Sequence, residues 1–352
     1  MNMNKMKIKK GLLLLVIMLS YSCNKSIGQV SDERSKQLVE IAEKINKFYV
    51  FEDTAIALSK KIIFEIENKA FENLSDQEFA DSLSSYLAKN GNDLHFNVLY
   101  RPNFEEKPVN EKEILKQHDK INRQWNYGFE KVQRLDGNIG YIEYTGFPEG
   151  NKNAIEILDA AMNFISNTNA LIIDLRNNRG GDGKMVVEFL SYFFNDKIML
   201  SERYTRYNDS ISKSYTKQKV GGKKYLNKPI YILVNNKTIS AAEGLAYNLQ
   251  QLKLASIIGD STYGAANPVQ VFYIDNKFHV FIPVSVEKNG VTGTNWEHLG
   301  IVPDIKIKSE KALNKAHFIA LENLLKSKIK TELTSEEIKE KLNSIGLLLN
   351  EK

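Results

Sequence analysis

Alternating strand and helix patterns between Asn138 and Asp260 constrain the fold of this 352-residue chain more than any other feature. The runs "ALIIDLR" and "PIYILVN" are continuously apolar, which is typical of strands buried on both faces of a sheet. A helical pattern follows each run, in "GKMVVEFLSYFF" and "SAAEGLAYNLQQL". We therefore expect an α/β fold, with a mostly parallel central sheet and helices on its faces.

Helical patterns lie on both sides of this region. Three amphipathic patterns and a short strand predict an N-terminal helical domain over residues 31–100, a small helical bundle. Residues 101–136 are expected to form a connector, residues 137–310 the α/β core, and residues 311–352 the C-terminal helices. Within the core, "VFYIDNKFHVFIPVSVEKNG" predicts an antiparallel pair of strands that turns at Asp275–Asn276.

The first 23 residues have the proportions of a targeting segment. "MNMNKMKIKKGLLLLVIMLSYSC" joins basic residues to an apolar run that is too short to cross a bilayer, which predicts a signal peptide over residues 1–23. Cys23 is the only cysteine, and its position after "LSYS" resembles a bacterial lipobox, so we expect lipidation there. The expected location is the bacterial cell envelope, facing the periplasm or the cell exterior, with this anchor as the only membrane contact.

The charge balance excludes one class of function. The formal net charge of +5 includes four lysines of the predicted signal peptide, so the remaining chain carries only about +1. Proteins that bind nucleic acids usually carry a strongly positive charge, which this chain lacks, and no nucleic-acid-binding motif is present. We therefore expect no nucleic-acid partner. One cysteine and scattered histidines also argue against a zinc site, so we expect no metal and no cofactor.

Two strand ends carry residues that suit acyl transfer. "LIIDLRNNRGGDG" passes from a buried strand into Gly180 and Gly181, where main-chain N–H groups can approach a ligand closely. Ser240 stands where "YILVN" gives way to a helix, and it is either a helix cap or a nucleophile. As a nucleophile, Ser240 would place the N–H of Ala241 beside that of Gly181 or Gly180 as an oxyanion hole.

Several blocks together resemble a known family. "GNIGYIEY", "ALIIDLRNNRGG", "ILVNNKTISAAEGLA", "SIIGDSTYGAANP" and "GTNWEHLGIVPDI" match, in order and spacing, the C-terminal processing (tail-specific) serine peptidase family. The resemblance covers roughly residues 90–310. It implies a crotonase-like core shared with Clp-type proteases, a peptide or protein substrate, and Ser240 as the nucleophile.

Departures from the family pattern indicate a branch. The processing peptidases carry a catalytic lysine in a "TxGKG"-like block, whereas this chain has Ala265 and Ala266 in "STYGAANP". It is more similar to the branch of tricorn protease and the interphotoreceptor retinoid-binding protein, which uses a Ser–His–Glu arrangement. That resemblance implies His95 as the base and Glu297 as its orienting partner. His298 replaces a small residue there, and it would narrow the site or offer a competing base.

Three further expectations complete the prediction. A PDZ domain before the core is not expected, because only 43 residues separate His95 from Asn138. One alternative function is a non-catalytic carrier of apolar ligands on the same fold, and another is a crotonase-type acyl-thioester enzyme. Neither the natural substrate nor the oligomeric state follows from these patterns.

Overall fold

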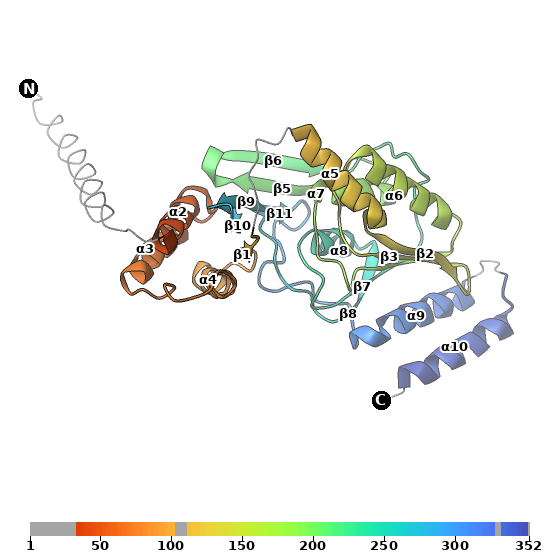
Figure 1. Ribbon diagram of the computed structural model, residues 1–352. Helices are drawn as coiled ribbons and strands as arrows, with labels where there is room; N and C mark the ends of the chain where they lie inside the picture. The colour runs from red at the N-terminus through yellow and green to blue at the C-terminus, as the bar shows by residue number, and fades with distance from the viewer. Residues whose placement is uncertain (1–32, 103–110, 328–331, 351–352) are drawn as a thin grey trace, which may run out of the picture.

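The central sheet has six strands in the order β12-β8-β7-β4-β3-β2, and the computed structural model describes residues 33–102, 111–327 and 332–350 (Figure 1). Its strands are β2 (Phe129–Leu135), β3 (Ile139–Tyr144), β4 (Ala170–Asp174), β7 (Ile230–Val234), β8 (Ala255–Gly259) and β12 (Ile305–Lys306). All neighbouring pairs are parallel except β2 with β3. The predicted α/β fold with a mostly parallel sheet is confirmed.

The apolar runs form the centre of this sheet. All five residues of β4 and all five of β7 are buried, as expected for strands covered on both faces. Leu171, Ile172 and Ile173 are fully buried, and each such side chain stabilises the fold by about 1.5–3 kcal/mol. Strand β2 falls inside the segment expected as a connector. Its polar sequence concealed it, because an edge strand is largely exposed.

Helices cover both faces of the sheet. One face packs against α6 (Lys152–Ile165), α7 (Gly183–Leu190) and α8 (Ala241–Gln251). The other face packs against α9 (Ala312–Lys326), which presents the small residues Ala312, Ala316 and Ala320, and α10 (Ser335–Asn350) packs on α9. Single 3-10 turns occur at Asn126–Gly128, Ser191–Phe193, Arg206–Asn208 and Ser309–Lys311.

The N-terminal helices form a second core beside the first (Figure 1). Helices α2 (Glu33–Phe48), α3 (Glu52–Glu67) and α4 (Asp76–Gly91) lie where three helical patterns are predicted. They pack on a separate sheet of order β1-β10-β9, formed by β1 (Asn97–Tyr100), β10 (Phe278–Pro283) and β9 (Val269–Ile274). The antiparallel pair β9–β10 with its turn at Asp275–Asn276 is confirmed, but it packs on the N-terminal helices rather than on the central sheet.

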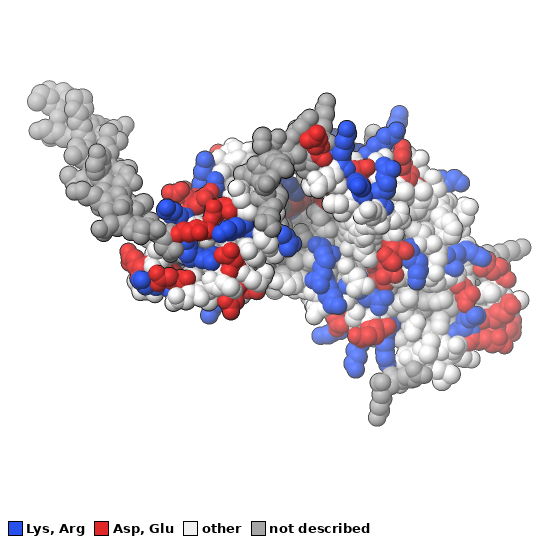
Figure 2. All heavy atoms as spheres, in the orientation of Figure 1, with Lys and Arg blue, Asp and Glu red and all other residues white. Residues whose placement is uncertain are grey.

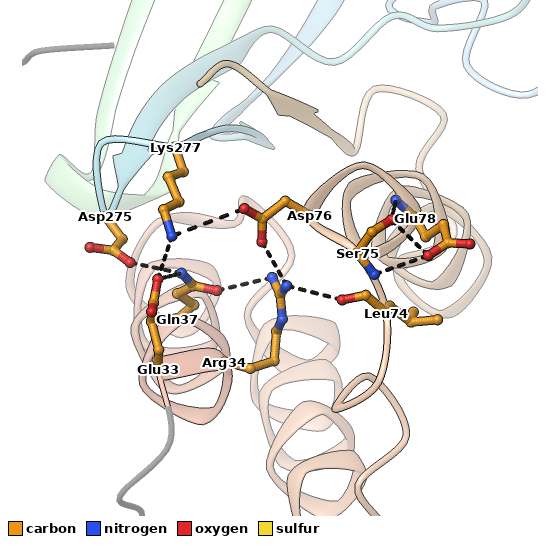
Figure 3. Close-up of polar contacts among 9 residues, drawn as sticks. All are labelled: Glu33, Arg34, Gln37, Leu74, Ser75, Asp76, Glu78, Asp275 and Lys277. Atoms are coloured by element: carbon orange, nitrogen blue, oxygen red, sulfur yellow. Dashed lines mark hydrogen bonds and ion pairs between the residues drawn. The ribbon is translucent and has the colours of Figure 1, made fainter. Parts of the chain in front are cut away.

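A polar network fastens these helices to the β9–β10 turn (Figure 3). Arg34 of α2 donates to Asp76 of α4 at 2.8 Å. Gln37 donates to Asp275 at 2.8 Å, and Lys277 forms an ion pair with Glu33 at 2.5 Å. The network therefore joins two helices to a hairpin about 240 residues away in sequence.

A third sheet was not predicted from the sequence. Strands β5 (Met199–Thr205), β6 (Ser210–Tyr215) and β11 (Ser285–Asn289) form an antiparallel sheet of order β11-β5-β6. Most of its residues are polar and half-exposed, so no apolar alternation revealed β5 and β6. This sheet supplies one wall of the cavity described below.

Charged side chains of both signs are spread over the face of the molecule in Figure 2. Helix α5 (Glu111–Gln124) lies above the central sheet in Figure 1. In the three described ranges, no helix combines the length and the apolar character needed to cross a bilayer.

Candidate active site

A cavity of about 660 Å³ lies beside the turn that joins β7 to α8. Apolar side chains of α7 and β5 line one part of it, including Val186, Leu190 and Leu200. Polar groups of the third sheet line another part, including the ion pair between Arg203 and Glu287 at 2.8 Å. The cavity thus has both apolar and hydrogen-bonding walls, as small-molecule and peptide sites commonly do.

Ser240 lines this cavity in a strained conformation. Its backbone has φ 59° and ψ −119°, whereas an ordinary helix cap is extended with negative φ. A non-glycine residue held in a sparsely populated backbone region costs of order 1–3 kcal/mol and persists where the surroundings enforce it. A serine on a strained strand-to-helix turn presents its hydroxyl at the end of the sheet, as nucleophilic serines do.

The glycine turn after β4 approaches Ser240 closely. A Cβ atom built on Gly180 would lie 2.9 Å from the Cβ of Ser240, so only glycine fits there. Gly181 and Ala241 line the cavity together with Ser240. Within the described residues, no hydrogen bond uses the N–H of Gly181 or of Ala241, so both remain available to a ligand.

Gly180 differs from Gly181 in this respect. Its N–H donates to Oδ1 of Asn178 at 2.9 Å. Of the two glycines expected as oxyanion donors, only Gly181 therefore has an uncommitted N–H. The sequence could not separate them, because the distinction depends on which amide the buried Asn178 side chain binds.

Asn178 is a supporting residue that the sequence analysis missed. It is fully buried, and its Nδ2 donates to the carbonyl oxygen of Tyr144 at 2.9 Å. Its main-chain carbonyl accepts the N–H of Ile239, which directly precedes Ser240. Asn178 thus ties β3, the glycine turn and the serine turn together.

Glu243 is a second supporting residue. The sequence places it in the first turn of a helix, where a carboxylate interacts favourably with the helix dipole. The structure shows it fully buried, with its carboxylate accepting hydrogen bonds from Ser240, Gly264, Ala265, Thr262 and Trp296. Burial raises the pKa of Glu243 to about 7, although its hydrogen bonds act in the opposite direction.

His95 and Glu297 lie together with a third residue, Asp93. One potential ligand atom from each of the three lies within 4.8 Å of the other two. Glu297 accepts hydrogen bonds from the N–H groups of Ala266, at 2.5 Å, and Asn267, at 3.1 Å. Asp93 accepts a hydrogen bond from Nδ2 of Asn267 at 2.8 Å, so one short segment holds both carboxylates.

This grouping differs from the expectation that no potential metal ligands would cluster. The sequence concealed it, because Asp93 and Glu297 are about 200 residues apart. Burial, and after it the charge of Glu297, raises the pKa of Asp93 to about 7. Burial also lowers the pKa of His95 to about 4, so its imidazole is neutral near pH 7.

The structure does not join His95 to Ser240 directly. Nδ1 of His95 is buried without a hydrogen-bond partner, and among the described residues no hydrogen bond links the imidazole to the serine hydroxyl. The two groups are connected through Ala266, which lines the cavity and donates its N–H to Glu297. The predicted residues therefore form two adjoining sets, Ser240 with Gly181 and Ala241, and His95 with Glu297.

His298 and Cys23 are two further positions singled out from the sequence. His298 does not line the cavity, and its Nε2 lies 3.9 Å from a carboxylate oxygen of Glu297. Whether His298 narrows the site or competes as a base stays a prediction. Cys23, the expected lipidation site, lies outside the described residues.

The fold and the cavity together define a class of protein. Ser240 lies on a strained turn at the end of a mostly parallel sheet, and two available N–H groups lie beside it. Serine hydrolases place their nucleophile and oxyanion donors in this arrangement. Residues 138–307 match the family described as Peptidase family S41. The α/β core is therefore similar to a peptidase family S41 domain.

Individual relatives agree with this assignment. The chain is 27% identical to carboxyl-terminal-processing peptidase 2, chloroplastic, of Arabidopsis thaliana over 168 residues, which are 47% of this chain and 31% of that protein. The chain thus spans about a third of the length of this curated relative.

Two solved structures share the fold. A lipoprotein from Streptococcus agalactiae is 18% identical, with a TM-score of 0.54 over 82% of this chain and 96% of that chain. The tricorn protease is 11% identical, with a TM-score of 0.51 over 83% of this chain and 37% of that chain.

Proposed function

We propose that this protein is a serine peptidase that hydrolyses peptide bonds through an acyl-enzyme on Ser240. The observation that carries the proposal is the strained turn of Ser240 beside two uncommitted N–H groups, those of Gly181 and Ala241. Such donors stabilise the negative charge of a tetrahedral intermediate. The substrate would be a peptide or protein segment that enters the cavity.

The chemistry follows from the residues of the two sets. Ser240 Oγ attacks the carbonyl carbon of the peptide bond while His95 accepts the hydroxyl proton. His95 then gives this proton to the departing amine, and a water molecule hydrolyses the ester by the same route. The carboxylates of Glu297 and Asp93 would stabilise the imidazolium that forms between these transfers.

This proposal requires His95 and Ser240 to approach each other on substrate binding. Catalytic hydrogen bonds are often long or absent without substrate and shorten in the reactive complex. Residues 264–268 lie between the two sets, because Ala266 and Pro268 line the cavity while Ala266 and Asn267 hold Glu297. A substrate in the cavity would therefore contact the segment that positions the His95 set.

The proposal extends to the branch and to the cellular location. We propose a Ser–His–Glu arrangement of the tricorn-like branch, because Ala265 and Ala266 stand where a lysine is expected and because ligand atoms of His95 and Glu297 lie within 4.8 Å of each other. The short spacing between His95 and Asn138 supports the absence of a PDZ domain between them. A lipid anchor at Cys23 in the cell envelope is supported by the sequence around that residue.

Reaction with a fluorophosphonate probe tests the mechanism. We expect the full chain to be labelled at Ser240, and we expect Ser240→Ala to lose labelling and to lower peptide cleavage by at least about 10³-fold. Ser212→Ala is the matched control, because Ser212 is an exposed serine that also lines the cavity. Equal labelling of wild type and Ser240→Ala would refute the mechanism.

Probe labelling, together with ligand-binding and thioesterase assays, separates a peptidase from the two alternative functions. A carrier of apolar ligands would bind a fatty acid or retinoid tightly without reacting with the probe. A crotonase-type acyl-thioester enzyme would act on coenzyme A esters and would be indifferent to Ser240→Ala.

A further inference from the structure

Asp93, His95 and Glu297 form a compact set of three potential metal ligands. One ligand atom from each residue lies within 4.8 Å of the others. Ligand atoms at about 2.0–2.2 Å from a tetrahedral zinc ion lie about 3.4 Å apart, so the most distant atoms of the set must approach each other by about 1–1.5 Å to share an ion. A cation could therefore contact all three groups after small rotations of the side chains.

The charges of this set are not balanced by protein cations. Asp93 is fully buried, the side chain of Glu297 is 11% exposed, and the two carboxylates repel each other. In the described part of the chain, neither carboxylate forms an ion pair with a lysine or an arginine. Paired buried carboxylates without a counter-charge are costly, and a bound cation would remove this cost.

The polar contacts around the set hold it in place without using all of its ligand positions. Nδ2 of Asn267 and the N–H of His95 each donate to Asp93, at 2.8 Å and 3.0 Å. Among the described residues, Oε1 of Glu297 accepts one hydrogen bond, a long one of 3.4 Å from the N–H of Leu94, and Nε2 of His298 lies 3.9 Å from it. Nδ1 of His95 is buried and accepts or donates no hydrogen bond within the described part of the chain. An imidazole nitrogen without a donor or acceptor beside it is available to a metal ion.

We propose that Asp93, His95 and Glu297 bind a divalent transition-metal ion of the Zn²⁺ type. The mixed set of one imidazole and two carboxylates favours Zn²⁺ over Mg²⁺ and Ca²⁺, which prefer oxygen ligands alone. Three protein ligands leave a fourth position for water.

The consequence for activity is inhibition, and this part rests on the proposed peptidase function. When an ion binds one imidazole nitrogen of His95, the ring proton resides on the other nitrogen, which then has no lone pair to accept the proton of Ser240. The occupied site would therefore keep the enzyme inactive. Removal of the ion by a chelator would restore His95 as the base. The ion would also fix residues 266–267 through Glu297 and Asp93, next to the cavity wall.

Isothermal titration of the full chain with Zn²⁺ tests the site. We expect one equivalent of Zn²⁺ to bind, and we expect His95→Gln and Asp93→Asn each to weaken binding by at least about tenfold. His118→Gln is the matched control, because His118 is an exposed histidine of α5. Circular dichroism confirms that the variants fold, and Asp93→Asn preserves the size of the buried group. Absence of stoichiometric binding, or equal binding by His95→Gln and His118→Gln, would overturn the proposal.

Fluorophosphonate labelling of Ser240 with and without Zn²⁺ tests the inhibition. We expect Zn²⁺ to slow labelling of wild type by at least about tenfold, with recovery on addition of EDTA. Stoichiometric Zn²⁺ binding with unchanged labelling would overturn the inhibitory role. Zn²⁺ binding by a wild-type protein that is never labelled would instead refute the proposed function and leave the metal site supported.

Discussion

The main-chain N–H of Ser240 donates a hydrogen bond to Oε2 of Glu243 at 2.8 Å. The same buried carboxylate accepts the N–H groups of Gly264 and Ala265 and the indole N–H of Trp296. One side chain therefore holds the strained serine turn and the segment that leads to the His95 set. Because strain persists only where the surroundings enforce it, Glu243 is the residue that we expect to maintain the serine geometry.

Replacement of this carboxylate tests that role. In Glu243→Gln, an amide group faces the donors that now bind a carboxylate oxygen, so at least one buried donor loses its acceptor. We expect the free energy of unfolding at pH 7 to fall by about 2 kcal/mol and probe labelling of Ser240 to slow. The control is Glu78→Gln, since Glu78 caps α4 in the same way but is exposed. If urea denaturation shows that Glu243→Gln lowers the free energy of unfolding no more than Glu78→Gln does, this role of Glu243 is contradicted.

The stability contributed by Glu243 is expected to depend on pH. Burial raises the pKa of this carboxyl group to about 7 from its ordinary value of 4.5. A pKa that is higher in the folded state means that the contribution is fully present below about pH 4.5 and is lost as the pH rises through about 7. The free energy of unfolding of wild type, relative to Glu243→Gln, should therefore be larger at pH 5 than at pH 8. The same difference at both pH values in urea denaturation would show that the carboxyl group does not titrate in this range.

Asn178 offers a test of the support beneath the oxyanion donors. Asn178→Ala leaves the buried N–H of Gly180 and the carbonyl of Tyr144 without their partner, so we expect a loss of about 1–3 kcal/mol in stability. Labelling of Ser240 should also slow, because the glycine turn is no longer fixed. Thermal unfolding and labelling rates measure the two effects. The neighbouring residue Asn177 is exposed, and Asn177→Ala should change neither quantity.

Gly181 provides a test of the oxyanion hole itself. Gly181 has a φ of 134°, and a Cβ atom added to it would lie only 1.9 Å from the carbonyl oxygen of Phe147. The backbone must therefore move in Gly181→Ala. We expect labelling of Ser240 to fall by about 10²-fold, as when an oxyanion donor is removed. Gly293→Ala is the control, because Gly293 also has positive φ (68°) but nothing lies near its Cβ. It should cost only about 1 kcal/mol of stability and leave labelling unchanged. Equal labelling of the two glycine variants would argue against Gly181 as a donor.

The pattern of apolar residues predicts much of the fold because burial acts on short segments. Strands β4 and β7 lie in the continuous apolar runs, and α2, α3 and α4 lie where helical periodicity occurs. The sheet of β5, β6 and β11 escaped prediction, because its side chains pack only partly and carry no periodic signal. The docking of β9–β10 on the N-terminal helices was also hidden, since the contact joins segments far apart in the chain.

The sequence by itself determined the α/β alternation, the place of Ser240 between a strand and a helix, and the identity of the residues available for chemistry. Only the tertiary structure decided that Gly181 rather than Gly180 keeps a free N–H, that Glu243 lies beneath the serine turn, and that Asp93 joins His95 and Glu297. The physical reason is that strand and helix formation follow from local side-chain patterns, whereas hydrogen-bond partners and charge clusters depend on which distant segments pack together.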